Sequence, residues 1–296
     1  MKDIETTELT AFLTRAEALL ARVETLLPPP AVAPDWRAHA FRWRKHGGRG
    51  RLEGVNLLHQ IFLENLQCVD EQKQRLEQNT RQFVSRRSAN NVLLTGAHGT
   101  GKSSLVKALL GKFAPKGLRL IEVDKDDLVD LPEIVDQIAM RPEWFIIFCD
   151  DLSFEAGEPG YKALKSVLDG SICAMPDNLL IYATSNRRHL MPEFMGENLD
   201  AKHTAEGEVH PGEASNEKIS LSERFGLWLS FYPFDQEHYL SICAHWLGTF
   251  GLSAKQIDAA RGEALRWTLL RGSRSGRVAW QFARDYAGRS PEQSRK

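Results

Sequence analysis

The chain has 296 residues, of which 42% are apolar and 26% are charged, and its formal net charge is −1. This composition is typical of a soluble globular protein, and it gives the whole molecule no electrostatic bias toward nucleic acid or acidic membranes. No stretch approaches the length of a membrane-spanning helix, and the acidic start does not resemble a signal peptide. We therefore expect a cytoplasmic protein without a membrane partner.

The first expected element is an amphipathic helix within residues 1–27. Apolar residues recur three and four apart from Leu9 to Leu26, and the helix must end at the prolines that begin with Pro28. The apolar seam covers only about three heptads, which is short for a free coiled coil. We therefore favour packing of this helix onto its own domain over pairing with another chain.

Residues 28–54 are expected to form a proline-rich linker and a basic-aromatic arm, DWRAHAFRWRKHGGRGR. In one interpretation, nucleic-acid bases stack on Trp36, Phe41 and Trp43 while the neighbouring cations bind phosphates. In the other, which we prefer, these aromatic side chains anchor an extended arm to the body of the protein and the cations are solvated.

Continuous apolar strands alternate with helices across residues 55–235, which predicts an α/β domain whose parallel sheet is covered on both faces. Residues 236–296 have helical patterns only, so a smaller helical domain should follow. The expected strands are NVLLT, LRLIEV, EWFIIFCDD, NLLIYATSN and LWLSFYPF.

The stretch TGAHGTGKSS follows the first of these strands and leads into a helix. It satisfies the pattern GxxxxGK[ST], in which glycines let the backbone wrap a phosphate chain. In this pattern Lys102 reaches the β and γ phosphates, and the Ser103 hydroxyl binds Mg²⁺. The predicted nucleotide-binding loop consists of Gly96, Ala97, His98, Gly99, Thr100, Gly101, Lys102, Ser103 and Ser104.

Polar residues follow two later strands, where they would lie near the phosphates. Asp150 ends FIIFCDD and is expected to hold Mg²⁺, directly or through water. Asp151 could orient the attacking water, but its carboxylate is one methylene shorter than that of glutamate, so Glu155 is an alternative. Asn186 ends the strand IYATSN and could face the γ phosphate and the water.

Two arginines complete the pattern: Arg224 in SERFG precedes a strand, and Arg277 in SGR opens a C-terminal helix. Together with GAHGTGKSS, FIIFCDD and TSN, these motifs resemble those of an AAA+ ATPase. The longer segments NVLLTGAHGTGKSSLVKALL, HPGEASNEKISLSERFGLWLSFYPFDQEHYL and GRVAWQFARDY are similar to an uncharacterised bacterial family, domain of unknown function 815. This similarity extends over residues 36–290.

The resemblance implies a P-loop AAA+ core with a C-terminal helical lid, and ATP and Mg²⁺ as cofactors. It makes Asn186 the sensor 1 residue, Arg277 the sensor 2 residue and Arg224 an arginine finger that acts on the ATP of a neighbouring subunit. A homo-oligomer follows from that finger. The chain departs from the pattern at Asp151, where most AAA+ ATPases have glutamate, and in LQCVDEQK, which lacks the usual glycine beside adenine.

These features predict an ATPase that remodels or loads an unidentified protein or nucleic-acid client. The Asp-Asp pair keeps a second hypothesis open, a nucleotide-dependent switch or scaffold with little hydrolysis. A P-loop kinase for a small molecule is a third and weaker one, because it would need a short acceptor-binding lid rather than a terminal helical domain.

Overall fold

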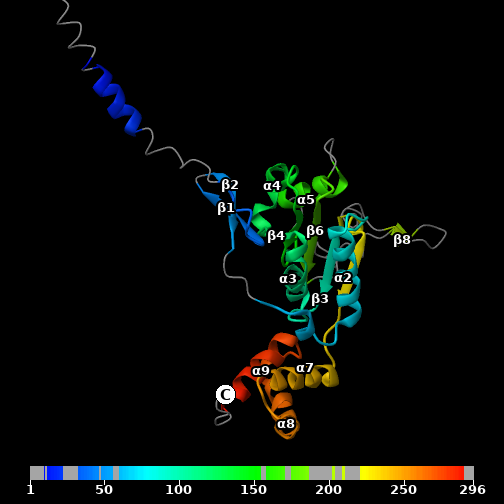
Figure 1. Ribbon diagram of the computed structural model, residues 1–296. Helices are drawn as coiled ribbons and strands as arrows, with labels where there is room; N and C mark the ends of the chain where they lie inside the picture. The colour runs from blue at the N-terminus through cyan, green and yellow to red at the C-terminus, as the bar shows by residue number, and fades with distance from the viewer. Residues whose placement is uncertain are drawn as a thin grey trace, which may run out of the picture.

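The computed structural model describes residues 10, 12–22, 33–46, 48–55, 60–154, 158–170, 175–186, 202–203, 209–210 and 221–289. Figure 1 shows an α/β body, a helical bundle below it at the C-terminal end, and the N-terminal helix standing away from both. The body is the part that carries the predicted phosphate-binding loop.

A seven-stranded sheet forms the centre of the body, with strand order β2-β1-β4-β5-β6-β3-β9. All neighbouring strands in it are parallel except the antiparallel pair β1–β2. The predicted α/β fold with a parallel sheet is therefore confirmed. The strands are β1 (Ala40–His46), β2 (Arg49–Gly54), β3 (Val92–Gly96), β4 (Leu118–Glu122), β5 (Trp144–Cys149), β6 (Leu179–Ser185) and β9 (Leu227–Phe231).

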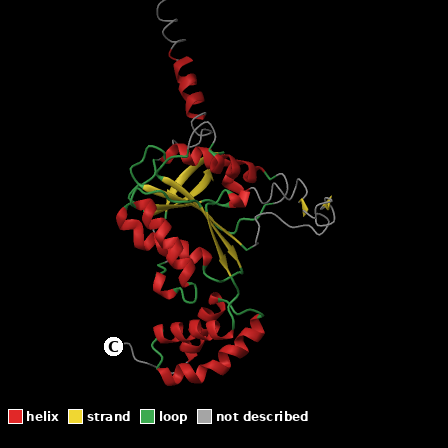
Figure 2. Ribbon diagram, turned by 90° about the vertical axis from the view of Figure 1, so that its right-hand side faces the viewer, coloured by secondary structure: helices red, strands yellow, loops and turns green. Residues whose placement is uncertain are grey.

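Helices cover both faces of this sheet (Figure 2), which explains why its strands are continuous apolar runs. Successive side chains of a strand point to opposite faces, so Leu93 and Leu94 of β3 belong to different hydrophobic clusters. On the Leu94 face lie α2 (Asp70–Val84) and α3 (Lys102–Phe113), and on the Leu93 face lie η3 (Lys125–Asp130), α4 (Leu131–Ile138) and α5 (Pro159–Asp169). The short helices η1 (Leu63–Asn65) and η2 (Ala114–Lys116) flank them.

The basic-aromatic arm is a β-hairpin that extends the sheet. Strand β1 pairs with β4 in parallel, so the sheet begins at Ala40 and the hairpin is continuous with the domain expected at residues 55–235. Phe41 and Trp43 are fully buried, and Trp36 packs against Phe41 with ring centroids 5.3 Å apart. The aromatic side chains therefore anchor the arm, and stacking of bases on Phe41 and Trp43 is excluded.

Four cations of the hairpin form ion pairs, which corrects the expectation that they are simply solvated; they are Arg42, Arg44, Lys45 and Arg51. Arg42 lies 2.7 Å from Glu122 and Lys45 lies 2.8 Å from Asp130, both between side-chain nitrogen and carboxylate oxygen. These pairs are half-exposed, so each contributes little to stability.

We expect Trp43→Ala to destabilise the body by about 3–5 kcal/mol, because it removes a fully buried indole and leaves a cavity. The substitution also removes the hydrogen bond from Trp43 Nε1 to Asp130 Oδ2, which measures 2.9 Å. Urea unfolding followed by circular dichroism would measure this loss. Phe12→Ala, at a position 68% exposed, is the control and should change stability by less than about 0.5 kcal/mol. Equal effects of the two substitutions would contradict the buried hairpin.

The N-terminal helix is described over residues 12–22, and the rest of the range expected at Leu9–Leu26 lies largely outside the described residues. Its apolar side chains Phe12, Leu13, Leu19 and Leu20 are exposed, and the helix projects away from the body (Figure 1). The prediction that it packs onto its own domain is wrong for the described chain. The helices of the body already cover both faces of the sheet, so the apolar side chains of the N-terminal helix cannot pack against the sheet.

Three helices form the C-terminal bundle: α7 (Gln236–Thr249), α8 (Ala254–Arg271) and α9 (Gly276–Arg289). Tyr239 of α7 and Phe282 of α9 are fully buried in it. Asp235 caps α7 by accepting a hydrogen bond from the His238 N–H at 2.8 Å. This bundle confirms the expected helical region after the sheet. A two-stranded pair, β7 (Lys202–His203) and β8 (Val209–His210), lies apart from the main sheet. Among the described residues, no helix has the length and apolar character needed to cross a membrane.

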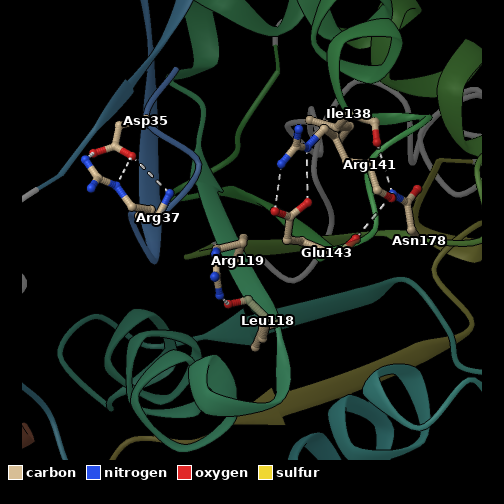
Figure 3. A network of polar contacts seen from close by, with 8 residues as sticks. All are labelled: Asp35, Arg37, Leu118, Arg119, Ile138, Arg141, Glu143 and Asn178. Carbon is tan, nitrogen blue, oxygen red and sulfur yellow. Dashed lines mark hydrogen bonds and ion pairs between the residues drawn. The ribbon is translucent and has the colours of Figure 1, made fainter. Parts of the chain in front are cut away.

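A polar network holds the chain where β6 begins (Figure 3). The Asn178 side-chain amide donates hydrogen bonds to the carbonyls of Ile138 at 3.0 Å and Arg141 at 2.9 Å. Arg141 in turn pairs with Glu143 at 2.8 Å, just before β5. The network fixes β5 and β6 together at their start, and these two strands deliver Asp150 and Asn186 at their far ends.

Candidate nucleotide-binding site

The glycine-rich loop connects β3 directly to α3. Gly96, Gly99 and Gly101 have φ angles of +126°, +71° and +103°, a conformation that side chains with a Cβ rarely adopt. A Cβ on Gly96 would also lie 1.9 Å from the Phe231 carbonyl oxygen of β9. Glycine is therefore required for the close approach of loop and sheet, as the sequence pattern predicts.

Lys102 begins α3 and its side chain turns back into the loop. Its Nζ donates to the carbonyls of Gly96 at 2.7 Å and Ala97 at 2.8 Å, and to Asn186 Oδ1 at 2.9 Å. Burial lowers the pKa of Lys102, while the nearby carboxylates of Asp151 and Asp150 act in the opposite direction. Hydrogen bonds from Lys102 thus connect the backbone of the loop to Asn186, the residue that follows β6.

Asp150 follows β5 and accepts two short hydrogen bonds on one oxygen. The Ser103 and Thr184 hydroxyls each donate to Oδ1 at 2.6 Å. No described residue bonds to the other oxygen, Oδ2. A serine hydroxyl beside a carboxylate is a donor set that suits Mg²⁺, which commonly takes one or two protein ligands and completes its shell with water and phosphate oxygens. Among the described residues there is no cluster of three or more His, Cys, Asp or Glu side chains that could hold a metal.

Asp151 has a φ of +54°, which is uncommon for a residue with a side chain. Two bonds hold it there: its N–H donates to Thr184 Oγ1 at 2.8 Å, and the Asn186 amide donates to its carboxylate. Its alternative, Glu155, lies outside the described residues. Of the two candidate bases, Asp151 is the one that the structure describes beside Lys102 and Asn186.

Most of the predicted site residues line a cavity of about 570 Å³. Its volume falls in the range of pockets that hold small molecules or cofactors. Its polar lining includes Lys102, Asp150, Asp151, Asn186 and Arg277. Its apolar lining does not follow from the sequence, apart from the segment that begins at Leu66. The apolar lining residues are Ile61, Leu66, Val69, Phe234, Ile242, Trp246 and Trp280.

The lid touches the glycine-rich loop directly. The Gly276 N–H at the start of α9 donates to the Gly99 carbonyl at 2.9 Å, and Arg277 lines the cavity one residue later. A Cβ on Gly99 would lie 2.9 Å from Ser275, a buried residue of the lid. The position of the lid is therefore tied to the conformation of the loop.

We expect Gly99→Ala to weaken nucleotide binding by about tenfold, or 1.4 kcal/mol, because the new methyl group pushes Ser275 and the lid away from the loop. Gly170→Ala is a matched control, since Gly170 has a φ of +68° but a Cβ there would have no neighbouring atom within 4 Å. Both substitutions strain the backbone, and only the first alters the lid contact. Titration with a fluorescent nucleotide would compare them, and equal affinities would contradict the coupling of lid and loop.

Arg224 does not line this cavity. It forms an ion pair with Asp169 at the end of α5. It lines a separate cavity of about 900 Å³, together with Arg86, Arg141 and Trp144. Within one chain, therefore, Arg224 is not part of the cluster around Lys102.

The strand order and the glycine-rich loop after β3 together define a P-loop protein with the AAA+ fold, here followed by a helical lid. The family described as "Protein of unknown function (DUF815)" matches residues 36–290, and the chain belongs to this family. The match covers the hairpin, the body and the bundle.

Solved structures similar to the chain include the following two. A mutant of Thermotoga maritima RuvB has 14% sequence identity and a TM-score of 0.50, with 77% of this chain and 64% of that chain covered. PCH-2 of C. elegans has 16% identity and a TM-score of 0.49, covering 78% of this chain and 67% of its own. The chain thus spans less than two thirds of the length of RuvB, and the likeness at this identity concerns the fold alone. No curated protein matches the chain.

Proposed function

We propose that the protein is an AAA+ ATPase that binds ATP in the cavity between body and lid and hydrolyses it at subunit interfaces to remodel or load a client. One observation carries the proposal. The cavity brings Lys102, Ser103, Asp150, Asn186 and Arg277 together from four separate segments of the chain. The polar residues of the lining suit a phosphate chain, and the apolar and aromatic residues of the lining suit a base.

Each residue of the cavity has a separate role in ATP binding or hydrolysis under this proposal. Lys102 and Arg277 supply positive charge for the phosphates, and the backbone N–H groups at the start of α3 donate hydrogen bonds to them. Mg²⁺, held by Ser103 and Asp150, would supply further positive charge where negative charge develops. Asp151, or Glu155, orients the attacking water together with Asn186, and the carboxylate alone accepts the proton of the water.

Arg224 has its role in a neighbouring subunit under this proposal. An arginine supplied in trans stabilises charge in the transition state of phosphoryl transfer. The separate location of Arg224 supports this role, because an arginine that serves its own nucleotide would line the same cavity as Lys102. The assembly is then a homo-oligomer whose ATP sites need two chains.

A nucleotide-dependent switch with little hydrolysis is the second candidate. The observation in its favour is the conformation of Asp151, whose φ of +54° and bond from Asn186 hold a short carboxylate in one place. Such a protein would change its assembly or its lid angle on binding ATP without rapid turnover.

Phosphate release from ATP and Mg²⁺ tests the proposal. Lys102→Ala is expected to lower turnover by about 100-fold, since one buried cation that faces the phosphates is lost. If the wild-type protein shows no turnover above Lys102→Ala but binds ATP, the switch is supported and the ATPase is rejected. Failure of the wild-type protein to bind any nucleoside triphosphate would reject both.

A further inference from the structure

Thr184 is the only side chain in the described site that bonds to both consecutive aspartates. It lies near the end of β6 and is 1% exposed. Its hydroxyl donates to Asp150 Oδ1 at 2.6 Å and accepts from the Asp151 N–H at 2.8 Å. The directions of both bonds are fixed, because an amide N–H can only donate and the hydroxyl hydrogen is then free for the carboxylate.

A third hydrogen bond connects Thr184 to the turn that follows β5. The Leu152 N–H donates to the Thr184 carbonyl oxygen at 2.7 Å. Three successive residues, Asp150 to Leu152, are thus each bonded to Thr184 at the point where β5 leaves the sheet. Backbone in the left-handed region costs of order 1–3 kcal/mol when it is not a glycine, so the turn at Asp151 needs such support.

The two bonds of the hydroxyl have different consequences for the two aspartates. The bond to Asp150 adds to the one from Ser103 on the same oxygen, and it leaves Oδ2 without a partner among the described residues. The bond from Asp151 fixes the peptide that sets the direction of the Asp151 side chain toward Asn186. A single hydroxyl therefore sets the orientation of one carboxylate suited to a metal and of one suited to water.

We propose that Thr184 is a positioning residue that couples metal binding to water orientation in this site. The inference rests on the proposed function, since it assigns Thr184 a part in the same ATP site. It also accounts for the sequence TSN as a unit. Thr184 lies in β6 and Asn186 directly follows the strand, and between them they bond to Asp150, Asp151 and Lys102.

The test compares Thr184→Val, which keeps the shape of the side chain and loses the hydroxyl, with Thr184→Ser, which keeps the hydroxyl. Removal of a group that orients a metal ligand typically lowers metal affinity or activity about 10- to 100-fold. We expect Thr184→Val to lower kcat by about that factor and to reduce the gain in nucleotide affinity that Mg²⁺ gives. Affinity measured in EDTA should stay at the wild-type level. Thr184→Ser should restore both properties.

Thr80→Val is the matched control, because Thr80 of α2 is fully buried and bonds to the Tyr182 hydroxyl, away from the site. Thr184→Ala is a second variant in case the valine methyl group disturbs folding, and the same losses are expected of it. Wild-type Mg²⁺ dependence and kcat in both hydroxyl-free variants would overturn the inference. Absence of nucleotide binding in the wild-type protein would instead reject the proposed function, so the two failures are distinguishable.

Discussion

Arg224→Ala should lower ATP turnover by about 10³-fold, because an arginine supplied across a subunit interface contributes a factor of about 10³–10⁵ in phosphoryl transfer. Nucleotide affinity should stay near the wild-type value. The reason is geometric: Arg224 lines the cavity beside Trp144 and pairs with Asp169, and it does not line the cavity that contains Lys102 in its own chain. Phosphate release and fluorescent-nucleotide titration would measure the two properties separately.

Mixed oligomers give the sharper form of this experiment. A chain with Lys102→Ala keeps its arginine and loses its own site, whereas a chain with Arg224→Ala keeps its site and lacks the arginine. Each variant alone should be inactive, and mixing them should restore turnover at the interfaces that pair an intact site with an intact arginine. Arg86→Ala, which alters the same cavity at an exposed position, is the control and should retain activity. If mixing restores nothing, or if Arg224→Ala loses nucleotide affinity, Arg224 does not act in trans.

The parts of the site that follow from sequence are those encoded locally. The phosphate-binding loop is a contiguous pattern after a buried strand, and Asp150 and Asn186 each end an apolar run. Because parallel strands end at the same edge of a sheet, polar residues after two neighbouring strands come together without further information. The structure accordingly brings the side chains of Lys102, Ser103, Asp150 and Asn186 into one hydrogen-bonded cluster that includes Asp151.

The parts that were missed depend on contacts between distant segments. The hairpin was expected as an arm because its cations alternate with aromatic residues. Their partners Glu122 and Asp130 lie about eighty residues away, and local pattern does not show them. The apolar lining of the cavity combines Leu66 with Trp246 and Trp280 of the lid, so it forms only when the body and the lid come together. A signal for Thr184 is present in the sequence, since it is a hydroxyl residue two positions before Asn186, where the apolar strand ends.

Asp151→Ala is expected to lower kcat by a factor of about 10²–10⁴, the range for loss of a positioned general base, while ATP binding is retained. Glu155→Ala should leave kcat close to the wild-type value. The structure favours Asp151 because its carboxylate lines the cavity and bonds to Asn186, which in turn accepts from Lys102 at 2.9 Å. Lys102 and the candidate base Asp151 are thus connected through the single amide of Asn186.

Asp151→Asn provides the matched control for shape, because it removes the charge of the carboxylate and keeps its size. It should lose turnover to the same extent as Asp151→Ala if the carboxylate accepts a proton, whereas a purely structural role would be largely preserved by asparagine. Single-turnover phosphate release would separate chemistry from product release in each variant. If Glu155→Ala causes the large loss and Asp151→Asn does not, the base is Glu155. In that case the Asn186 bond to Asp151 serves to hold the turn after β5 in place and has no part in orienting water.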